Sequence, residues 1–344
     1  MPVEHNNFRS IEHRQQHGSD AIAILWGRAL LSNTGIPLNL DWVREVRVNT
    51  SAVERRAQSQ VARRTVKKEW QAAWLLRAIT CMDLTTLSGD DTDERVRRLC
   101  AKGRHPIQPE LERKLGIEEL QIKVAAICVY HTFVETALRA LEGSGVHVAA
   151  VSTGFPAGLS PLAERVNEIR RSVEAGAHEI DVVITRAHVF GGRWQALYDE
   201  IAAFKQASGS RHMKVILGTG DLLTLRNVAR ASVVAMMAGA DFIKTSTGKE
   251  PTNATLPLGL VMVRAIREYA QQTGMAVGFK PAGGIRTAKQ SIDWLAMIKE
   301  ELGGSWMRSE MFRFGASGLL GDIELQLEHH ATGRYSAEYR HPMA

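Results

Sequence analysis

Three charged side chains lie in apolar segments, where a charge is costly to bury. Lys244 and Lys280 each end a short apolar run, and Asp181 lies in the middle of a third. Charges are kept in such places when they are paired or when they do chemistry. A buried lysine can attack a carbonyl as a free amine, and a neighbouring carboxylate can move protons. We interpret the three as one candidate catalytic group. The alternative is that each lysine buries only its aliphatic stem and extends its ammonium group to solvent.

Glycines follow two further apolar runs and come directly before predicted helices. Gly283 and Gly284 lead through Arg286 into a helix, and Gly315 with Ser317 precedes the last helix. Free backbone N–H groups at a helix N-terminus are a binding site for phosphate. Glycines in such places can also be simple turns, but the neighbouring arginine and serine favour a phosphate site.

Elements of a parallel sheet are needed to bring these side chains together. Short apolar runs alternate with amphipathic helical stretches, a pattern typical of parallel sheets. The predicted strands are 79–84, 124–129, 146–151, 179–184, 213–217, 241–244, 275–279 and 311–316. A count of eight favours a closed (β/α)8 TIM barrel over an open sheet. In such barrels chemistry gathers at the C-terminal ends of the strands.

Helical patterns connect the predicted strands and also fill the start of the chain. The clearest is expected to have Ser160 as N-cap and Pro161 as its first residue, and to end at Gly176. Its apolar positions are Leu162, Val166, Ile169 and Val173. Other helices are predicted at 21–32, 53–77, 194–206, 222–238, 257–270 and 287–301. We therefore expect an N-terminal helical extension (1–77), a barrel domain (78–330) and a C-terminal tail (331–344).

The composition is that of an ordinary globular protein with a small basic excess. The chain has 43 basic and 37 acidic residues, a net charge of +6. The basic cluster 63–68 lacks interleaved aromatic residues, so we interpret it as a solvated helix face rather than a nucleic-acid site. The start of the chain is too polar for a signal peptide, and no early apolar stretch could span a bilayer. Three widely spaced cysteines fit a reducing compartment. We expect a cytoplasmic protein with no nucleic-acid or membrane partner.

Several motifs for other chemistry are incomplete. Residues 245–249 end in Gly-Lys, but Ile243 stands where a P-loop needs glycine. Gly218 and Gly220 lack the third glycine of a dinucleotide fingerprint. His13 and His17 have helical spacing for a metal, but no third ligand lies nearby. The sequence therefore gives no support for a zinc-dependent enzyme.

These segments together resemble the deoxyribose-phosphate aldolase family. The resemblance covers nearly the whole predicted barrel, and it is most specific in Asp241–Lys249 and Gly278–Arg286. Segments 64–70 and 332–335 are similar to the longer form of the family found in animals and some bacteria. The resemblance implies reversible cleavage of 2-deoxyribose 5-phosphate into glyceraldehyde 3-phosphate and acetaldehyde, without metal or cofactor. The expected partner is this small sugar phosphate, and a homo-oligomer is left open.

The resemblance also implies roles for individual residues. Lys244 matches the amine that forms the imine (Schiff base), Lys280 its activating cation, and Asp181 the acid and base, acting through water. The implied phosphate site comprises Thr247, Gly248, Lys249, Gly283, Gly284, Arg286, Gly315 and Ser317. Asp83 and Thr85 match positions near the substrate, and Cys128 matches a pocket cysteine.

The chain departs from the family pattern in three places. Gly318 replaces a hydroxyl residue that often follows the matched serine, and His131 replaces a common proline. The tail does not align with that of short members, whose C-terminal tyrosine assists proton transfer, so neither Tyr335 nor Tyr339 is assigned this role. Two alternatives remain: another lysine-dependent barrel aldolase, and an inactive barrel that only binds a phosphate metabolite.

Overall fold

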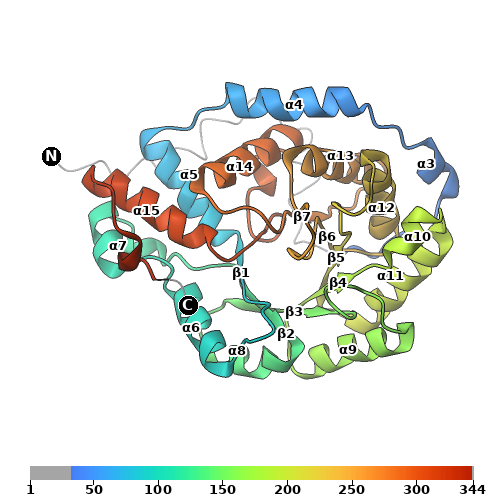
Figure 1. The fold of residues 1–344 in the computed structure, drawn as a ribbon, viewed down its shortest axis with the longest axis horizontal. Helices are drawn as coiled ribbons and strands as arrows, with labels where there is room; N and C mark the ends of the chain where they lie inside the picture. Colours follow the sequence, from blue (N-terminus) through green and yellow to red (C-terminus); the bar gives the residue numbers. More distant parts are fainter. Residues whose placement is uncertain (1–31, 343–344) are drawn as a thin grey trace. The chain divides into compact units, whose positions relative to one another are not determined.

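The computed structural model describes residues 32–342, in which eight parallel strands form a closed barrel. The strands follow the order β7-β6-β5-β4-β3-β2-β1-β8, and parallel bridges between Phe279 and Phe312 and between Ala282 and Gly315 close the ring. The strands are β1 (Met82–Thr85), β2 (Ala126–Tyr130), β3 (His147–Ser152), β4 (Glu179–Val183), β5 (His212–Ile216), β6 (Phe242–Lys244), β7 (Gly278–Lys280) and β8 (Phe314–Ala316). The fold is therefore the predicted (β/α)8 TIM barrel (Figure 1).

Helices surround the strands and connect each one to the next. The connecting helices are α6 (Asp93–Arg104), α7 (Pro109–Leu115), α8 (Val134–Ala140), α9 (Leu162–Glu174), α10 (Arg186–Phe190), α11 (Trp194–Ser208), α12 (Leu225–Met237), α13 (Leu256–Thr273) and α14 (Ala288–Leu302), with α15 (Leu319–Thr332) after β8. Short 3-10 turns lie at Glu118–Leu120, His131–Phe133, Gly304–Trp306 and Glu338–Arg340. Among the helices described, none is long and apolar enough to cross a membrane.

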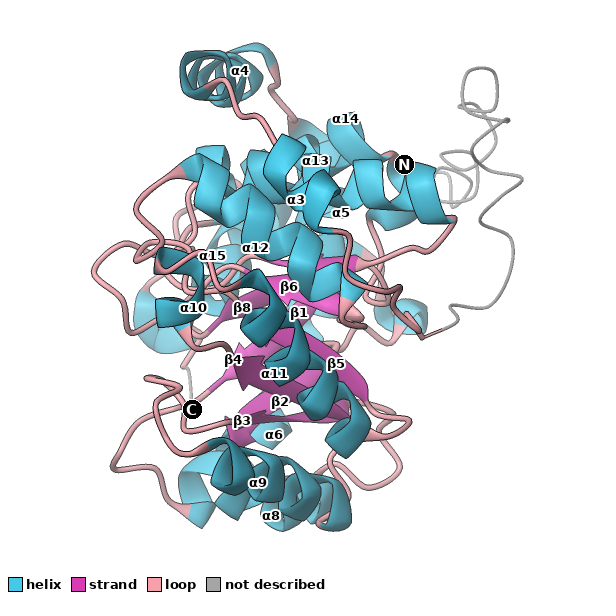
Figure 2. Cartoon of the chain, turned by 90° about the vertical axis from the view of Figure 1, so that its right-hand side faces the viewer, coloured by secondary structure: helices cyan, strands magenta, loops and turns pink. Residues whose placement is uncertain are grey.

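Between residue 32 and the barrel lie three helices: α3 (Leu40–Glu45), α4 (Thr50–Arg63) and α5 (Lys68–Thr80). Helix α4 lies outside α13 and α14 in both views of the ribbon (Figures 1 and 2). Arg56 of α4 forms ion pairs with Glu300 (2.9 Å) and Glu301 (3.3 Å) of α14. The division of the chain at residues 77 and 330 stays a prediction.

The barrel interior has an apolar half and a charged half. Leu87 and small side chains of β2 and β3, such as Ala126 and Ala149, form a buried apolar cluster. Tyr130 and Phe155 pack against this cluster. Strands β1, β4, β5, β6 and β7 carry buried charged side chains, which pair with one another inside the barrel.

The structure corrects four details of the predicted elements. The single helix expected at 53–77 is two helices, because Arg64 and Lys67 adopt extended backbone. The β-branched Thr65 and Val66 between them disfavour a helix. The first strand begins at Met82 rather than at 79, since α5 continues to Thr80. The predicted helix 21–32 lies almost wholly outside the described residues.

Helix α9 supplies the other two corrections. Pro161 has extended backbone and is the N-cap, so Ser160 is not the cap and the helix begins at Leu162. Leu162 is exposed, and of the predicted apolar stripe only Ile169 is fully buried. The buried face of α9 includes Arg165 instead, because its guanidinium pairs with Glu200 of α11 at 2.7 Å.

Candidate active site

Strand pairing sets the candidate catalytic residues side by side. Residues paired between neighbouring strands point to the same face of the sheet. Asp181 of β4 pairs with Lys214 of β5, and Lys244 of β6 pairs with Lys280 of β7. Asp181 also pairs with Val151, which belongs to the inward apolar cluster. All four charged side chains therefore point into the barrel.

The carboxylate of Asp181 is the common partner of three lysines. Its Oδ2 lies 2.8 Å from Nζ of Lys244 and 2.8 Å from Nζ of Lys280. Its Oδ1 accepts a hydrogen bond from Nζ of Lys214 at 2.9 Å. The structure thus brings together the three residues that the sequence singled out, in direct contact and with a further lysine.

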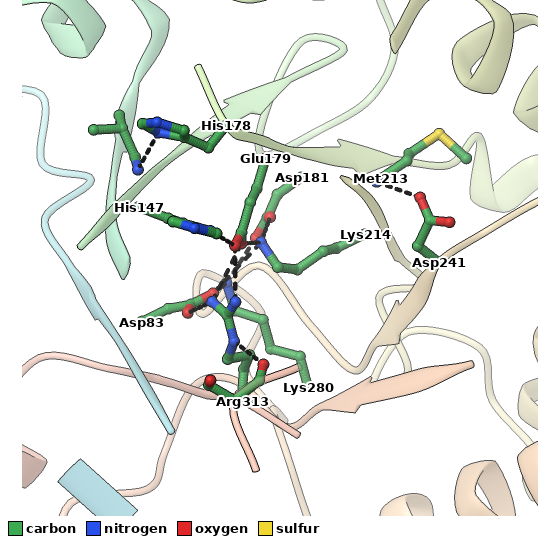
Figure 3. Close-up of polar contacts among 12 residues, drawn as sticks. Asp83, His147, His178, Glu179, Asp181, Met213, Lys214, Asp241, Lys280 and Arg313 are labelled. Carbon is green, nitrogen blue, oxygen red and sulfur yellow. Dashed lines mark hydrogen bonds and ion pairs between the residues drawn. The ribbon is translucent and has the colours of Figure 1, made fainter. Parts of the chain in front are cut away.

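A second group of charges lies next to this one (Figure 3). Lys280 and Arg313 both bond to Asp83 of β1. Arg313 also donates to Glu179 at 2.8 Å and 3.2 Å, and Lys214 forms an ion pair with Glu179. The ring of His147 hydrogen-bonds to Glu179 at 2.7 Å, and half of its side chain is exposed. One continuous polar network therefore runs through the charged half of the barrel.

Lys244 differs from the other two lysines in its access to solvent. Its side chain is 4% exposed, whereas those of Lys214 and Lys280 are 0% exposed. An amine that attacks a carbonyl has to be reached by the substrate. Of the three lysines, only Lys244 has any exposed side-chain surface.

The three lysines also differ in their pKa values. Burial lowers the pKa of Lys244, and the charge of Lys280 lowers it further, although Asp181 acts in the opposite direction. Burial also disfavours the charged forms of Lys280 and Lys214, but two or more carboxylates outweigh it and raise both pKa values. Lys244 is thus the lysine of this group that is most readily deprotonated, which amine nucleophiles require.

The carboxylates of the group remain ionised. Burial alone would raise the pKa of Asp181, but Lys214, Lys244 and Lys280 hold it well below the usual range. Burial would also raise the pKa values of Asp83 and Glu179, but neighbouring cations lower both. The cation with the largest effect is Lys280 for Asp83 and Arg313 for Glu179. Asp181 is therefore ionised at neutral pH and holds a negative charge next to the three lysines.

Three further predicted substrate-side residues have different surroundings. Asp83 belongs to the charged network, as described above. Thr85 does not: its hydroxyl donates to the backbone carbonyl of Asp83 at 2.8 Å. Cys128 lies in the apolar cluster, and burial raises the pKa of its thiol. Cys128 is therefore a neutral wall residue, unsuited to act as a nucleophile.

The loop after β6 is held by hydrogen bonds between its own residues. Glu250 accepts hydrogen bonds from the N–H of Thr247 (3.0 and 3.1 Å) and from its hydroxyl (2.7 Å). The same hydroxyl accepts from the N–H of Lys249 at 3.1 Å. Gly248 has a φ of +85° and is exposed with Lys249. The polar groups of Thr247 are thus occupied within its own loop, while Gly248 and Lys249 face solvent.

The two helix N-termini predicted to bind phosphate differ. At α14 side chains already accept hydrogen bonds from three N–H groups at the start of the helix. Gln290 accepts from Arg286 and Thr287, and Asp322 accepts from Ala288 at 2.6 Å. The side chain of Arg286 is exposed, and Gly283 and Gly284 turn the chain with φ near +80°.

Helix α15 begins without such a cap. Gly318 is its N-cap residue and offers no side chain to the first N–H groups. Ser317 and Gly318 are both exposed, directly after Gly315 and β8. Within the described part of the chain, α15 is therefore the more open of these two sites for an anion.

The tyrosines of the tail are exposed. The ring of Tyr335 stacks on His329, with centroids 4.6 Å apart, near the end of α15 remote from its N-terminus. Tyr339 contacts solvent over most of its surface.

Among residues 32–342, no group of three or more His, Cys, Asp or Glu side chains could hold a metal ion.

Sequence reasoning missed Lys214, Glu179 and Arg313. Each lies in an apolar strand or next to one, and each could have been found by the alternation rule that identified Asp181. Lys214, for instance, lies between the buried Met213 and Val215.

Comparisons with known proteins agree with this geometry. The family model described as DeoC/LacD family aldolase matches residues 77–319. Deoxyribose-phosphate aldolase of Mus musculus is 57% identical over 312 residues, covering 90% of this chain and 98% of that protein. The Homo sapiens protein of the same name is 56% identical and covers 91% and 99% of the two chains.

A solved structure supports the fold. Deoxyribose phosphate aldolase from Aeropyrum pernix has a TM-score of 0.52 at 23% identity, covering 81% of this chain and 99% of that one. From its barrel, its buried lysine group and these matches, the chain belongs to the DeoC/LacD family of aldolases.

Proposed function

We propose that this enzyme cleaves 2-deoxy-D-ribose 5-phosphate reversibly into D-glyceraldehyde 3-phosphate and acetaldehyde, through a Schiff base on Lys244. The names of the Mus musculus and Homo sapiens relatives support the substrate. The observation that carries the mechanism is a buried lysine with a lowered pKa, in contact with a carboxylate and near a second, charged lysine. This makes the protein a class I, metal-independent carbon–carbon lyase.

The proposed reaction begins with the amine of Lys244. The neutral amine adds to the aldehyde carbon of the open-chain sugar, and uptake of a proton with loss of water gives a protonated imine. Loss of a proton from the C3 hydroxyl then breaks the C2–C3 bond and releases glyceraldehyde 3-phosphate. The electron pair passes to the imine, which becomes an enamine. Protonation at C2 and hydrolysis release acetaldehyde and restore the lysine.

Asp181 and Lys280 are the proposed assistants of this reaction. Asp181 is held as an anion next to Nζ of Lys244, where it can take up and return protons through water. Lys280 keeps its proton, because Asp181 and Asp83 outweigh the effect of burial on its pKa. Its charge lowers the pKa of Lys244. A free lysine is only about 0.04% neutral at pH 7, so such a shift matters for the rate.

We place the phosphate of the substrate at the open N-terminus of α15. The N-cap residue Gly318 makes no side-chain cap, so the first N–H groups of α15 are available to bind an anion. Gly283 and Gly284, in the neighbouring loop, have the positive φ that lets backbone approach a ligand closely. Gly248, Lys249 and Arg286 complete the rim, whereas Thr247 shapes its own loop.

The proposal extends to the setting of the enzyme. Cys81, Cys100 and Cys128 are all free and buried, which fits a reducing compartment such as the cytoplasm. A homo-oligomer remains a prediction, which light scattering of the purified protein will test.

Borohydride trapping tests the central step. With acetaldehyde present, borohydride should reduce the imine and attach two carbons irreversibly to the peptide that contains Lys244. The Lys244→Met variant should be inactive at every pH and should not be labelled, because no amine remains. Peptide mass spectrometry reads out the site. Labelling of another peptide would reject the assignment, and binding without labelling would favour the inactive phosphate-binding barrel.

A further inference from the structure

Lys214 is a buried charge to which the proposed reaction gives no task. It lies on β5, wholly inside the barrel. Its ammonium group bonds to Asp181 at 2.9 Å and to Glu179, and it lies 3.6 Å from Asp83. Burying a charged lysine away from water is costly unless it is paired with an anion. One carboxylate would provide such a pair, and Lys214 has three nearby.

The charges of the barrel interior are unequal in number. The described carboxylates that face one another there are Asp83, Glu179 and Asp181, and the cations are Lys214, Lys244, Lys280 and Arg313. Other titratable groups near this site are the buried thiol of Cys128 on β2, the half-exposed ring of His147 on β3, His178 directly before β4 and His212 on β5. If all four cations were charged, one positive charge would be unbalanced.

Contacts decide which cation is in excess. Lys214 touches two carboxylates and lies near a third, and Lys280 and Arg313 touch two each. Lys244 touches only Asp181, whose Oδ2 it shares with Lys280 and whose Oδ1 is taken by Lys214. Lys244 is thus the least compensated cation of the group.

We propose that Lys214 is a positioning residue that keeps Lys244 unprotonated, by neutralising carboxylate charge that Lys244 would otherwise balance and by holding the Oδ1 side of Asp181. This inference rests on the proposed function, in which Lys244 must be a free amine. The pKa directions agree with it: those of Lys214 and Lys280 are raised, and that of Lys244 is lowered.

The Lys214→Met variant tests the charge balance. Without Lys214, three carboxylates face Lys280, Arg313 and Lys244, so Lys244 becomes the third balancing cation and its pKa rises. The acid limb of the pH profile of kcat/KM should move to higher pH. Like charges roughly 6 Å apart at an effective dielectric near 20 predict a shift of about one to two units. Activity at neutral pH should fall about tenfold or more, since one unit is about a factor of ten.

Removing an anion should have the opposite effect. Glu179→Gln leaves two carboxylates and all four cations, so the acid limb should move to lower pH. The double variant, Lys214→Met with Glu179→Gln, removes one charge of each sign. Its profile should return toward that of the wild type. A purely structural role for Lys214 predicts instead that the double variant is worse than either single one.

Two further variants complete the experiment. Lys214→Arg keeps the charge and should restore the profile. Lys102→Met removes a lysine that pairs with the buried Glu324 at 2.7 Å, outside the barrel interior, and should leave the profile unmoved. Each variant is also trapped with acetaldehyde and borohydride across pH, and in Lys214→Met labelling of Lys244 should reappear at alkaline pH.

The outcomes separate the two proposals. If wild-type Lys244 is not labelled, the proposed function fails. If wild-type Lys244 is labelled but Lys214→Met keeps the wild-type profile, the role of Lys214 is overturned. If Lys214→Met does not fold, Glu179→Gln decides alone: an acid shift supports the charge balance, and an unmoved profile overturns it.

Discussion

At the scale of single residues, two lysines that contact the same oxygen have opposite properties. Lys244 and Lys280 each lie 2.8 Å from Oδ2 of Asp181. Lys280 has a second carboxylate, Asp83, as a partner, and Lys244 has none. Burial disfavours the charge on both, but only Lys280 has enough anions to overcome it. The proposed division of labour between amine and cation would thus follow from the position of one carboxylate, Asp83.

This difference predicts the behaviour of the Lys280→Met variant. The variant loses the cation but keeps most of the length and apolar bulk of the side chain. Like charges about 5 Å apart at an effective dielectric near 20 correspond to roughly two pKa units, so the pKa of Lys244 should rise by about that much. We expect a large loss of kcat/KM at pH 7, partly recovered as the pH is raised. Wild-type activity at pH 7, or trapping on Lys280, would reverse the two assignments.

At the scale of elements, strand alternation determined what could be predicted from the sequence. A side chain between two apolar neighbours in a strand faces the other way, and this rule placed Asp181 in the barrel. It applies equally to Lys214, which lies between the buried Met213 and Val215. The partners of these groups could not be predicted. Arg313 reaches Asp83 and Glu179, 230 and 134 residues away, only because the barrel closes.

Helix boundaries show the same limit. Ser160-Pro161 has the sequence of a helix start, yet Pro161 is the cap and the buried face of α9 includes Arg165. The partner that makes this burial tolerable, Glu200, is on another helix. Local sequence predicts that a helix forms, whereas tertiary contacts decide which face is buried.

The N-termini of α14 and α15 give a prediction at this scale. Ser317→Leu should raise KM for deoxyribose 5-phosphate by about tenfold or more, the loss expected for a hydrogen bond to a charged group. It should change KM for unphosphorylated deoxyribose much less. Thr287→Ala removes the cap of α14, and should cost about 1 kcal/mol of stability while leaving both KM values unchanged. Both KM values are measured by steady-state cleavage assays. Equal effects of Ser317→Leu on the two substrates would place the phosphate elsewhere.

At the scale of the whole molecule, the barrel separates two kinds of interior. Side chains of β2 and β3 form an apolar cluster with Leu87, and the charged network lies beside it, since Asp83 pairs with Ala126 and Asp181 with Val151. The network is held from strands on both sides of the closure, from β1 to the segment before β8. A barrel can hold these charges in place because every strand contributes to one enclosed interior.

The imine mechanism predicts independence from metal ions. In a metal-dependent aldolase a bound zinc ion stabilises the developing negative charge, and here the protonated imine on Lys244 would do so. Cleavage of deoxyribose 5-phosphate should therefore survive exhaustive treatment with a chelator. The rate is measured before and after dialysis, with added zinc as the comparison. Activity that is lost with the chelator and restored by zinc would overturn the imine mechanism.

The charged network should also make stability depend on pH in a defined direction. The pKa of Glu179 lies well below its ordinary value, because Arg313 and Lys214 outweigh burial. Its contribution is therefore fully present above the unfolded-state pKa of about 4.3, and it is lost as the pH falls through the lower folded-state pKa. Glu179→Gln mimics the protonated acid, so it should differ most from the wild type at neutral pH.

Urea unfolding at several pH values measures this difference. At pH 7 Glu179→Gln should lower the free energy of unfolding by about 3–5 kcal/mol, as expected when one partner of a buried pair is removed. The difference should shrink as the pH falls below about 4, where the wild type begins to take up the same proton. Glu110→Gln, which removes an exposed pair with Lys114 on α7, is the control and should change stability little at any pH. A difference between Glu179→Gln and the wild type that stays constant from pH 7 to about pH 3 would mean that Glu179 contributes through packing rather than through its charge.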